Sequence, residues 1–327
     1  LNGHRITLVG YDKSSVIKVE SGTFTLCDCS GDSGKITNGY KDGGSQKYPG
    51  RGVSVSKNGT FTMYGGSITG NTEGGVFVGS NRTFTMNGGS ITGNTVTGSG
   101  GGVYVNEKGT FNMNGGEITG NTSSSYGGGV YVYRNAEFTM TGGSITDNAA
   151  SSKNKSNGGG VYSAGTFTMT GGSITRNKAE YGGGVWTDAS FTVSGNVNIT
   201  GNVGINGNTA SNVYPSLVQI TIGREGLKQE AKIGVTRNMI DPGKFVTIAT
   251  GATDSCTADN FTADAGEPFG IKVERNGAYV DVNLYNGLPH EHPICGKTCG
   301  HTDNKHTDIE WKHVSGLDEI TEAGNYY

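Results

Sequence analysis

The chain has 327 residues, of which 59 are glycine and only 6 are proline, and its formal net charge is −3. It carries no clustered basic run, which argues against a nucleic-acid partner, and no stretch of 18 apolar residues, which argues against a membrane span. Abundant glycine combined with a clear repeat indicates regular, tight turns rather than a low-complexity chain.

The first predicted elements belong to a degenerate copy of a repeat. RITLVG and VIKVE precede TFTLCDCS and KITNG, and Phe24 takes the place of a phenylalanine that later recurs. From Thr60 the repeat is regular, with TFTMYGGSITGN followed by TFTMNGGSITGN at Thr83. The recurring residues are 23 to 29 positions apart and are Phe61, Phe84, Phe111, Phe138, Phe167 and Phe191. A period of this length predicts a stack of similar structural units.

Each copy contains three short extended segments, T-F-T-M, S-I-T and G-V-Y-V, separated by glycine and asparagine. Alternation places Phe and Met of the first segment, Ile of the second and the valines of the third on interior faces. Segments this short form a stable sheet only when they stack on copies of themselves, about 4.8 Å apart. The sequence therefore predicts an all-β fold, a parallel β-solenoid with three short strands per coil.

Glycine and asparagine are predicted to form the corners of each coil. Gly88–Gly89, like the same pair in other copies, suits a sharp turn with positive φ. The asparagine that ends each S-I-T-G-N can hydrogen-bond through its amide to the equivalent amide one coil further on. We interpret these residues as a structural ladder rather than as catalytic groups. They are Asn71, Asn94, Asn121, Asn148, Asn177 and Asn202.

The GGSITGN and GGGVYV repeats resemble those of right-handed parallel β-helix proteins of the pectin-lyase-like type. In particular, they are similar to repeats of large bacterial cell-surface and secreted proteins described as adhesin-like. The resemblance covers roughly residues 20–215. It implies a right-handed coil, an extracellular or cell-surface location, and binding of glycans or host surface proteins.

The segment between the asparagine corner and the next G-V-Y-V varies in length, from NTE before Gly74 to NAASSKNKSN before Gly158. Such insertions project from one edge of a solenoid, which is often its binding side. The strand that follows carries an aromatic residue between inward-facing valines, so these rings are expected to form an exposed column. A column of this kind could bind sugar rings or a peptide strand, or the rings could simply stabilise the sheet by stacking. The candidate ligand-binding residues are Phe77, Tyr104, Tyr131, Tyr162, Trp186 and Tyr214.

Catalytic signals are sparse in the repeats. The outward positions hold mostly Ser, Thr, Asn and Gly, and the repeat register shows no pair of carboxylates of the kind that glycoside cleavage needs. Asp147 and Arg176 occupy equivalent positions on successive coils and are expected to form a surface ion pair. We expect a non-catalytic module and assign no catalytic residue. The alternative is a polysaccharide lyase or glycoside hydrolase that uses carboxylates in the inserts, such as Glu73 and Glu180.

The repeat fades after Asn202. VQITIG, AKIGVT and FVTIAT still read as strands, and a solenoid needs a cap that covers its last coil. We predict β-helix coils over residues 1–214 and an irregular, β-rich cap over residues 215–285. Residues 286–327 are expected to be a Cys/His-rich linker or the start of a following module, because they resemble linkers that join successive β-helical modules of surface proteins.

The linker contains a candidate metal site. The order H-x-H-x2-C-x3-C-x-H supplies nitrogen and sulfur ligands of the type that a structural zinc ion prefers. The spacing is not that of a standard zinc finger, so two alternatives stay open: a Cys295–Cys299 disulfide, or neither. The candidate ligands are His292, Cys295, Cys299 and His301.

Overall fold

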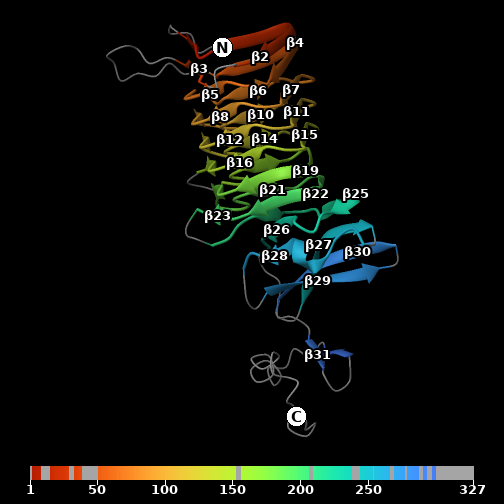
Figure 1. Ribbon diagram of the computed structural model, residues 1–327. Helices are drawn as coiled ribbons and strands as arrows, with labels where there is room; N and C mark the ends of the chain where they lie inside the picture. Colours follow the sequence, from red (N-terminus) through yellow and green to blue (C-terminus); the bar gives the residue numbers. More distant parts are fainter. Residues whose placement is uncertain are drawn as a thin grey trace.

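The computed structural model is an all-β parallel solenoid of about seven turns, as the sequence predicts. The coils stack from the N-terminal end, red in Figure 1, to a blue C-terminal sheet. The structure describes residues 2–8, 15–28, 33–38, 51–151, 156–205, 209–237, 244–252, 254–265, 269–276, 278–286, 290–292 and 297–299. Within these residues, no helix is long and apolar enough to cross a membrane.

Three parallel ladders of strands form the walls, one for each segment of the repeat. The first, which we call the FxM ladder, is built from β2 (Ile17–Leu26), β4 (Val53–Met63), β7 (Thr83–Met86), β11 (Thr110–Met113), β15 (Glu137–Met140), β19 (Thr166–Thr175), β22 (Phe191–Thr200) and β25 (Ile220–Leu227). Equivalent residues of the repeat pair directly, as Phe111 does with Phe138.

The second wall, the SIT ladder, continues through the later parts of β19 and β22. Its other strands are β1 (Arg5–Leu8), β3 (Lys35–Asn38), β5 (Ser67–Thr69), β8 (Ser90–Thr92), β12 (Glu117–Thr119), β16 (Ser144–Thr146), β26 (Lys232–Val235) and β28 (Phe261–Ala263).

The third wall, the VxV ladder, begins with the first parts of β2 and β4. It continues in β6 (Val76–Val78), β10 (Val103–Val105), β14 (Val130–Val132), β18 (Val161–Ser163), β21 (Val185–Thr187) and β24 (Val213–Pro215).

The core is a set of side-chain stacks that run along the solenoid axis. From Phe61 to Phe191 the six repeat phenylalanines are fully buried, with adjacent ring centroids 4.7–4.9 Å apart. This distance matches the spacing of neighbouring strands, so each ring stacks on its counterpart in the next coil. Burial of one such side chain stabilises the fold by roughly 2–3 kcal/mol.

The corner between the FxM and SIT ladders needs both of its glycines, for two different reasons. Gly89 has φ +80°, in the region that L side chains rarely adopt. Gly88 has no positive φ, but a Cβ there would lie 2.5 Å from the carbonyl oxygen of Tyr64 in the neighbouring coil. The prediction of positive φ is thus confirmed for the second glycine, whereas the first allows close approach of the backbones.

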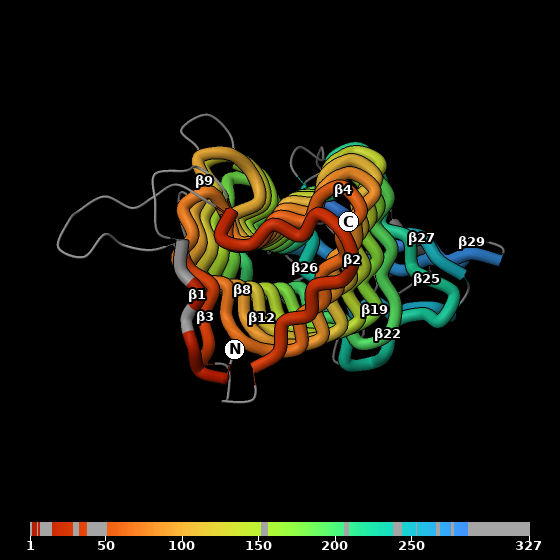
Figure 2. Tube along the Cα trace, turned by 90° about the horizontal axis from the view of Figure 1, so that it is seen from above, coloured from red at the N-terminus to blue at the C-terminus, as the bar shows by residue number. Residues whose placement is uncertain are grey.

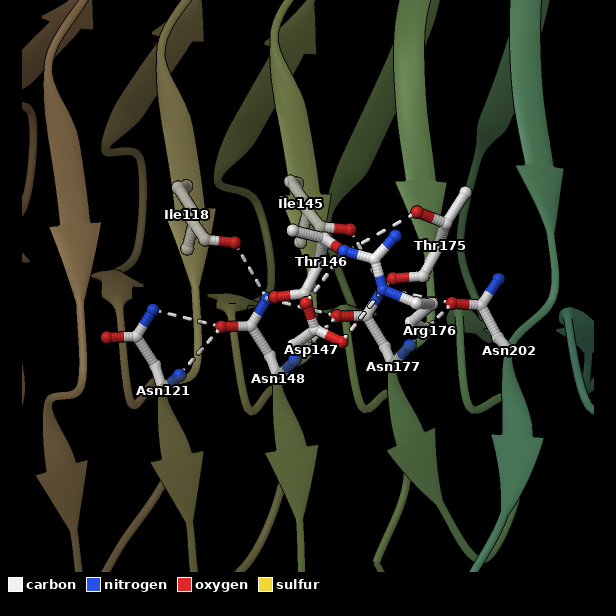
Figure 3. A network of polar contacts seen from close by, with 10 residues as sticks. All are labelled: Ile118, Asn121, Ile145, Thr146, Asp147, Asn148, Thr175, Arg176, Asn177 and Asn202. Carbon is white, nitrogen blue, oxygen red and sulfur yellow. Dashed lines mark hydrogen bonds and ion pairs between the residues drawn. The ribbon is translucent and has the colours of Figure 1, made fainter.

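The asparagine ladder is confirmed and extends beyond the repeats. Oδ1 of Asn121 accepts hydrogen bonds from the backbone N–H and Nδ2 of Asn94, at 3.0 and 2.9 Å. The same pattern repeats from Asn71 to Asn202, and every one of these residues is fully buried. Figure 3 shows part of this row on successive strands. The ladder then passes to Asn212 and ends at Asp264.

A fourth, shorter ladder lies within the inserts and was not predicted. Its five two-residue strands are β9 (Thr95–Val96), β13 (Thr122–Ser123), β17 (Ala149–Ala150), β20 (Lys178–Ala179) and β23 (Val203–Gly204). They pair in parallel, so part of each insert from Thr95 onward follows the coil instead of projecting as an irregular loop.

The C-terminal end changes from parallel to antiparallel pairing. β27 (Phe245–Ala252) pairs in parallel with β25, but it also pairs antiparallel with β30 (Tyr279–Asn286), which in turn pairs with β29 (Phe269–Asn276). A short 3-10 helix, η1 (Ala258–Asn260), precedes β28. Beyond them, β31 (His290–His292) and β32 (Lys297–Cys299) form an antiparallel pair.

Candidate functional site

The outward side of the VxV ladder carries a row of aromatic residues. In β14, Val130 and Val132 are fully buried and Tyr131 points away from the core between them. Alternation in a strand therefore places the aromatic residue outside in each coil. Five rings form a continuous stack that we call the aromatic column. They are Phe77, Tyr104, Tyr131, Tyr162 and Trp186.

The rings of the column cover one another's faces. Successive centroids lie 4.5–5.6 Å apart, and successive ring planes differ by 8–27°. All five side chains are therefore half-buried, although the sequence predicts an exposed column. Within the stack, each ring face is covered by a neighbouring ring, so the column presents the edges of its rings to solvent.

The sixth predicted residue, Tyr214, lies beside the column. Its backbone pairs with Trp186 in the ladder, as the repeat predicts. Its ring contacts that of Tyr181, with centroids 5.5 Å apart and planes tilted by 59°. Tyr181 comes from the insert that precedes β21.

Other aromatic residues flank the column, and sequence reasoning missed them. Tyr126, at the end of an insert, stacks on Tyr162 at 4.8 Å, and Tyr133, just after β14, packs against Tyr131 at 6.3 Å. The view along the axis in Figure 2 shows the chain bulging outward near the labels β9 and β4. Tyr126 was recognisable only as the last residue of NTSSSY, in a segment whose length varies between copies.

Arg51 lies beside the first two rings of the column. Its guanidinium carbon lies 5.0 Å from the ring centroid of Phe77 and 5.8 Å from that of Tyr104, within the range of cation–π attraction. Nη1 of Arg51 is buried and has no hydrogen-bond partner among the residues that the structure describes. Burial lowers the pKa of Arg51, and the nearby carboxylate of Glu73 acts in the opposite direction.

The three tyrosines of the column share one chemical property. In the described part of the chain, no hydrogen bond engages the hydroxyl of Tyr104, Tyr131 or Tyr162, and none of these oxygens is buried. Burial of the rings raises the pKa of all three, to about 12 for Tyr162. At physiological pH they are neutral hydroxyl groups in a row, one per coil, each able to donate and accept a hydrogen bond.

The predicted ion pair on the surface is confirmed. Nη2 and Nε of Arg176 donate to the two carboxylate oxygens of Asp147, at 2.8 and 3.0 Å (Figure 3). The hydrogen bonds from Arg176 lower the pKa of Asp147, so its carboxylate stays ionised and engaged in the ion pair. Asp147 therefore has the surroundings of a surface salt bridge rather than those of a general acid.

The zinc prediction falls largely outside the described residues. Cys295 and His301 lie outside them, and His292 and Cys299 are described only by the backbone of β31 and β32. Elsewhere in the described chain, no three His, Cys, Asp or Glu side chains come together as metal ligands. Structural zinc and a Cys295–Cys299 disulfide both stay predictions, which elemental analysis and thiol titration of the purified protein would separate.

Comparison with known proteins returned no relative. No protein-family model, curated protein or solved structure matches the chain significantly.

Proposed function

We propose that the chain is a non-catalytic binding module of a larger bacterial surface or secreted protein, and that its aromatic column binds glycans. The observation that carries the proposal is the column itself. It runs without interruption over five coils on the outward side of one ladder, and its half-buried rings remain partly accessible to a partner. Aromatic residues with polar tips are typical of binding surfaces that contact a partially polar ligand.

Stabilisation of the sheet by stacking would account for the rings but not for their hydroxyl groups. The buried phenylalanine stack from Phe61 to Phe191 already shows that this fold forms ring stacks without a polar atom. Tyr104, Tyr131 and Tyr162 add hydroxyl groups that the described protein leaves unpaired. Because these oxygens are not buried and are unpaired within the described protein, they are open to hydrogen bonds from a ligand.

The resemblance of the repeats to adhesin-like surface proteins supports the extracellular part of the proposal. In that setting, host-surface glycans or glycosylated proteins would be the partners. Antibody labelling of intact cells that produce the protein checks the location: labelling without permeabilisation is expected, and labelling that needs permeabilisation would exclude a surface role.

A glycan array tests the binding role directly. We expect the wild-type chain to bind a subset of glycans, and Tyr131→Ala and Trp186→Ala to lose at least about tenfold in affinity, because each removes a ring from the column. Thr139→Ala is the matched control, since Thr139 is a half-buried outward residue of the FxM ladder, on a different wall. Undiminished binding by both column variants would show that the column is not the binding surface.

A further inference from the structure

We infer that the column binds an uncharged, extended glycan that lies along the solenoid axis, with about one sugar residue per coil and hydrogen bonds to the hydroxyls of Tyr104, Tyr131 and Tyr162. This inference rests on the proposed function and adds the ligand's charge, direction and mode of contact.

The mode of contact follows from the stacking. A sugar ring that stacks on an aromatic residue needs a free ring face, but the faces between Phe77 and Trp186 are covered by the neighbouring rings. Arg51 lies beside Phe77 and Tyr104, with its guanidinium carbon 5.0 and 5.8 Å from their ring centroids. The ligand therefore meets ring edges and hydroxyl groups, so hydrogen bonds rather than ring stacking would select it.

The direction follows from the register. Tyr104, Tyr131 and Tyr162 are paired on adjacent strands. Their side chains therefore form one row along the solenoid axis, with one strand spacing, about 4.8 Å, from each coil to the next. An extended β-1,4-linked glycan advances by a similar length per sugar residue. Such a chain can present one hydroxyl group to each tyrosine only if it runs parallel to the axis. A helical α-1,4-linked chain cannot keep this register.

The absence of net charge follows from the groups around the column. At the N-terminal end, Arg51 is near Glu73, and beside Tyr162 the charges of Asp188 and Arg134 act in opposite directions. These positive and negative charges offset each other along the column. The surface therefore offers hydroxyl groups without an excess of positive charge that would favour carboxylated or sulfated sugars.

Calorimetric titration of the full chain with defined oligosaccharides tests the inference. The probes are cellohexaose, cellobiose, maltohexaose, and cello-oligosaccharides oxidised at C6 to carboxylates. We expect cellohexaose to bind more tightly than each of the others, because it alone is long, extended and uncharged.

The hydroxyl contacts are tested by the triple variant Tyr104→Phe, Tyr131→Phe and Tyr162→Phe, which keeps every ring of the stack. It should bind cellohexaose at least about tenfold more weakly, since each lost hydrogen bond reduces affinity by a factor of roughly 2 to 10. The control is the triple variant Thr85→Val, Thr139→Val and Thr168→Val, which removes three hydroxyl groups from the outward row of the FxM ladder. It should bind like the wild type.

The two proposals fail in different ways. If cellohexaose binds but the triple phenylalanine variant binds it equally well, or if oxidised oligosaccharides bind more tightly, the inference is wrong while the proposed function stands. Equal affinity for cellobiose and cellohexaose would exclude the axial direction.

If the wild type binds no cellohexaose but binds another glycan through the column on the array, only the inference fails. If Tyr131→Ala and Trp186→Ala leave all glycan binding unchanged, both fail.

Discussion

At the residue scale, the asparagine ladder shows how a polar side chain can be a core residue. Asn121 is fully buried, yet its Oδ1 accepts two hydrogen bonds and its Nδ2 donates to Oδ1 of Asn148 and to the carbonyl oxygen of Ile91. A buried amide is tolerated because each of its groups has a partner. The same residue type in every copy supplies identical partners, so the ladder depends on the repeat.

Removing one member of the ladder should destabilise the protein strongly. Asn121→Ala leaves the backbone N–H and Nδ2 of Asn94 without an acceptor, and we expect a loss of about 2–4 kcal/mol in the free energy of unfolding. Asn114→Ala is the control, because Nδ2 of Asn114 donates to Oδ1 of Asn87 at 2.8 Å on an exposed corner. This substitution should lower the free energy of unfolding by less than about 1 kcal/mol. Denaturant unfolding of the two variants measures the difference, and equal losses would contradict this role of the ladder.

At the element scale, two kinds of glycine corner have different tolerance. Gly116 has φ +84°, and an added Cβ would lie 2.6 Å from Cε of Met86 and 2.7 Å from the carbonyl oxygen of Gly89. Gly120 has φ +63°, but its nearest neighbour would be 3.9 Å away. Asp147 occupies the position equivalent to Gly120 one coil later, with φ +56°. The first corner is closed to side chains, whereas the second accepts them at the cost of an unfavourable φ.

Substitutions at these corners should differ accordingly. Gly116→Ala is expected to lower the free energy of unfolding by about 2 kcal/mol or more, because the backbone of the adjacent coil must move. Gly120→Asp should cost about 1 kcal/mol, at the lower end of the usual cost of positive φ, because aspartate is among the residues that tolerate this conformation. Thermal and denaturant unfolding would measure both values. A larger loss for Gly120→Asp than for Gly116→Ala would refute this distinction.

The end of the asparagine ladder predicts a pH dependence. Asp264 accepts hydrogen bonds from the backbone N–H and Nδ2 of Asn212, both at 2.6 Å, and from Oγ1 of Thr236 at 2.5 Å. Burial raises the pKa of Asp264, although these hydrogen bonds partly oppose the rise. Between the ordinary and the raised pKa, the folded chain binds more protons at this site than the unfolded chain, so stability falls as the pH rises through this window.

Asp264→Asn removes the titration and isolates this effect. We compare the free energy of unfolding of the wild type with that of Asp264→Asn. The wild type should lose stability relative to the variant as the pH rises above the ordinary pKa of an aspartic acid. Denaturant unfolding over a pH series measures the difference. A difference that grows with pH would mean that the three hydrogen bonds outweigh burial and that the pKa is lowered.

At the scale of the whole molecule, the stacked architecture explains what could be predicted from the sequence. Phe84, Met86 and Asn94 meet equivalent neighbours in each regular coil, so their burial follows from the repeat alone. The fourth ladder was missed because its strands read TV, TS, AA, KA and VG, without a shared side-chain pattern, and pair through the backbone. The rings that flank the column were missed because Tyr126 and Tyr133 come from turns that differ between coils.

The fold keeps its fully buried stacks apart from the aromatic column on the outward side of one wall. Phenylalanine, methionine, isoleucine, valine and asparagine stacks hold the interior, and they are repeated in nearly every regular coil. The outward side of the VxV ladder carries phenylalanine, tyrosine or tryptophan, from Phe77 to Trp186. The column is one of several stacks that join neighbouring coils, and the fully buried stacks stay intact when a column residue is replaced. Substitutions in the column should therefore change binding more than folding.

The most direct test places the ligand on the column by the fluorescence of Trp186. The chain has two tryptophans, Trp186 and Trp311, so a Trp311→Phe variant reports on the column alone. Titration of this variant with cellohexaose should change the emission of Trp186 saturably, with the midpoint that calorimetry gives for binding. Unchanged emission at concentrations that saturate the calorimetric signal would show that the glycan binds elsewhere and would contradict the account.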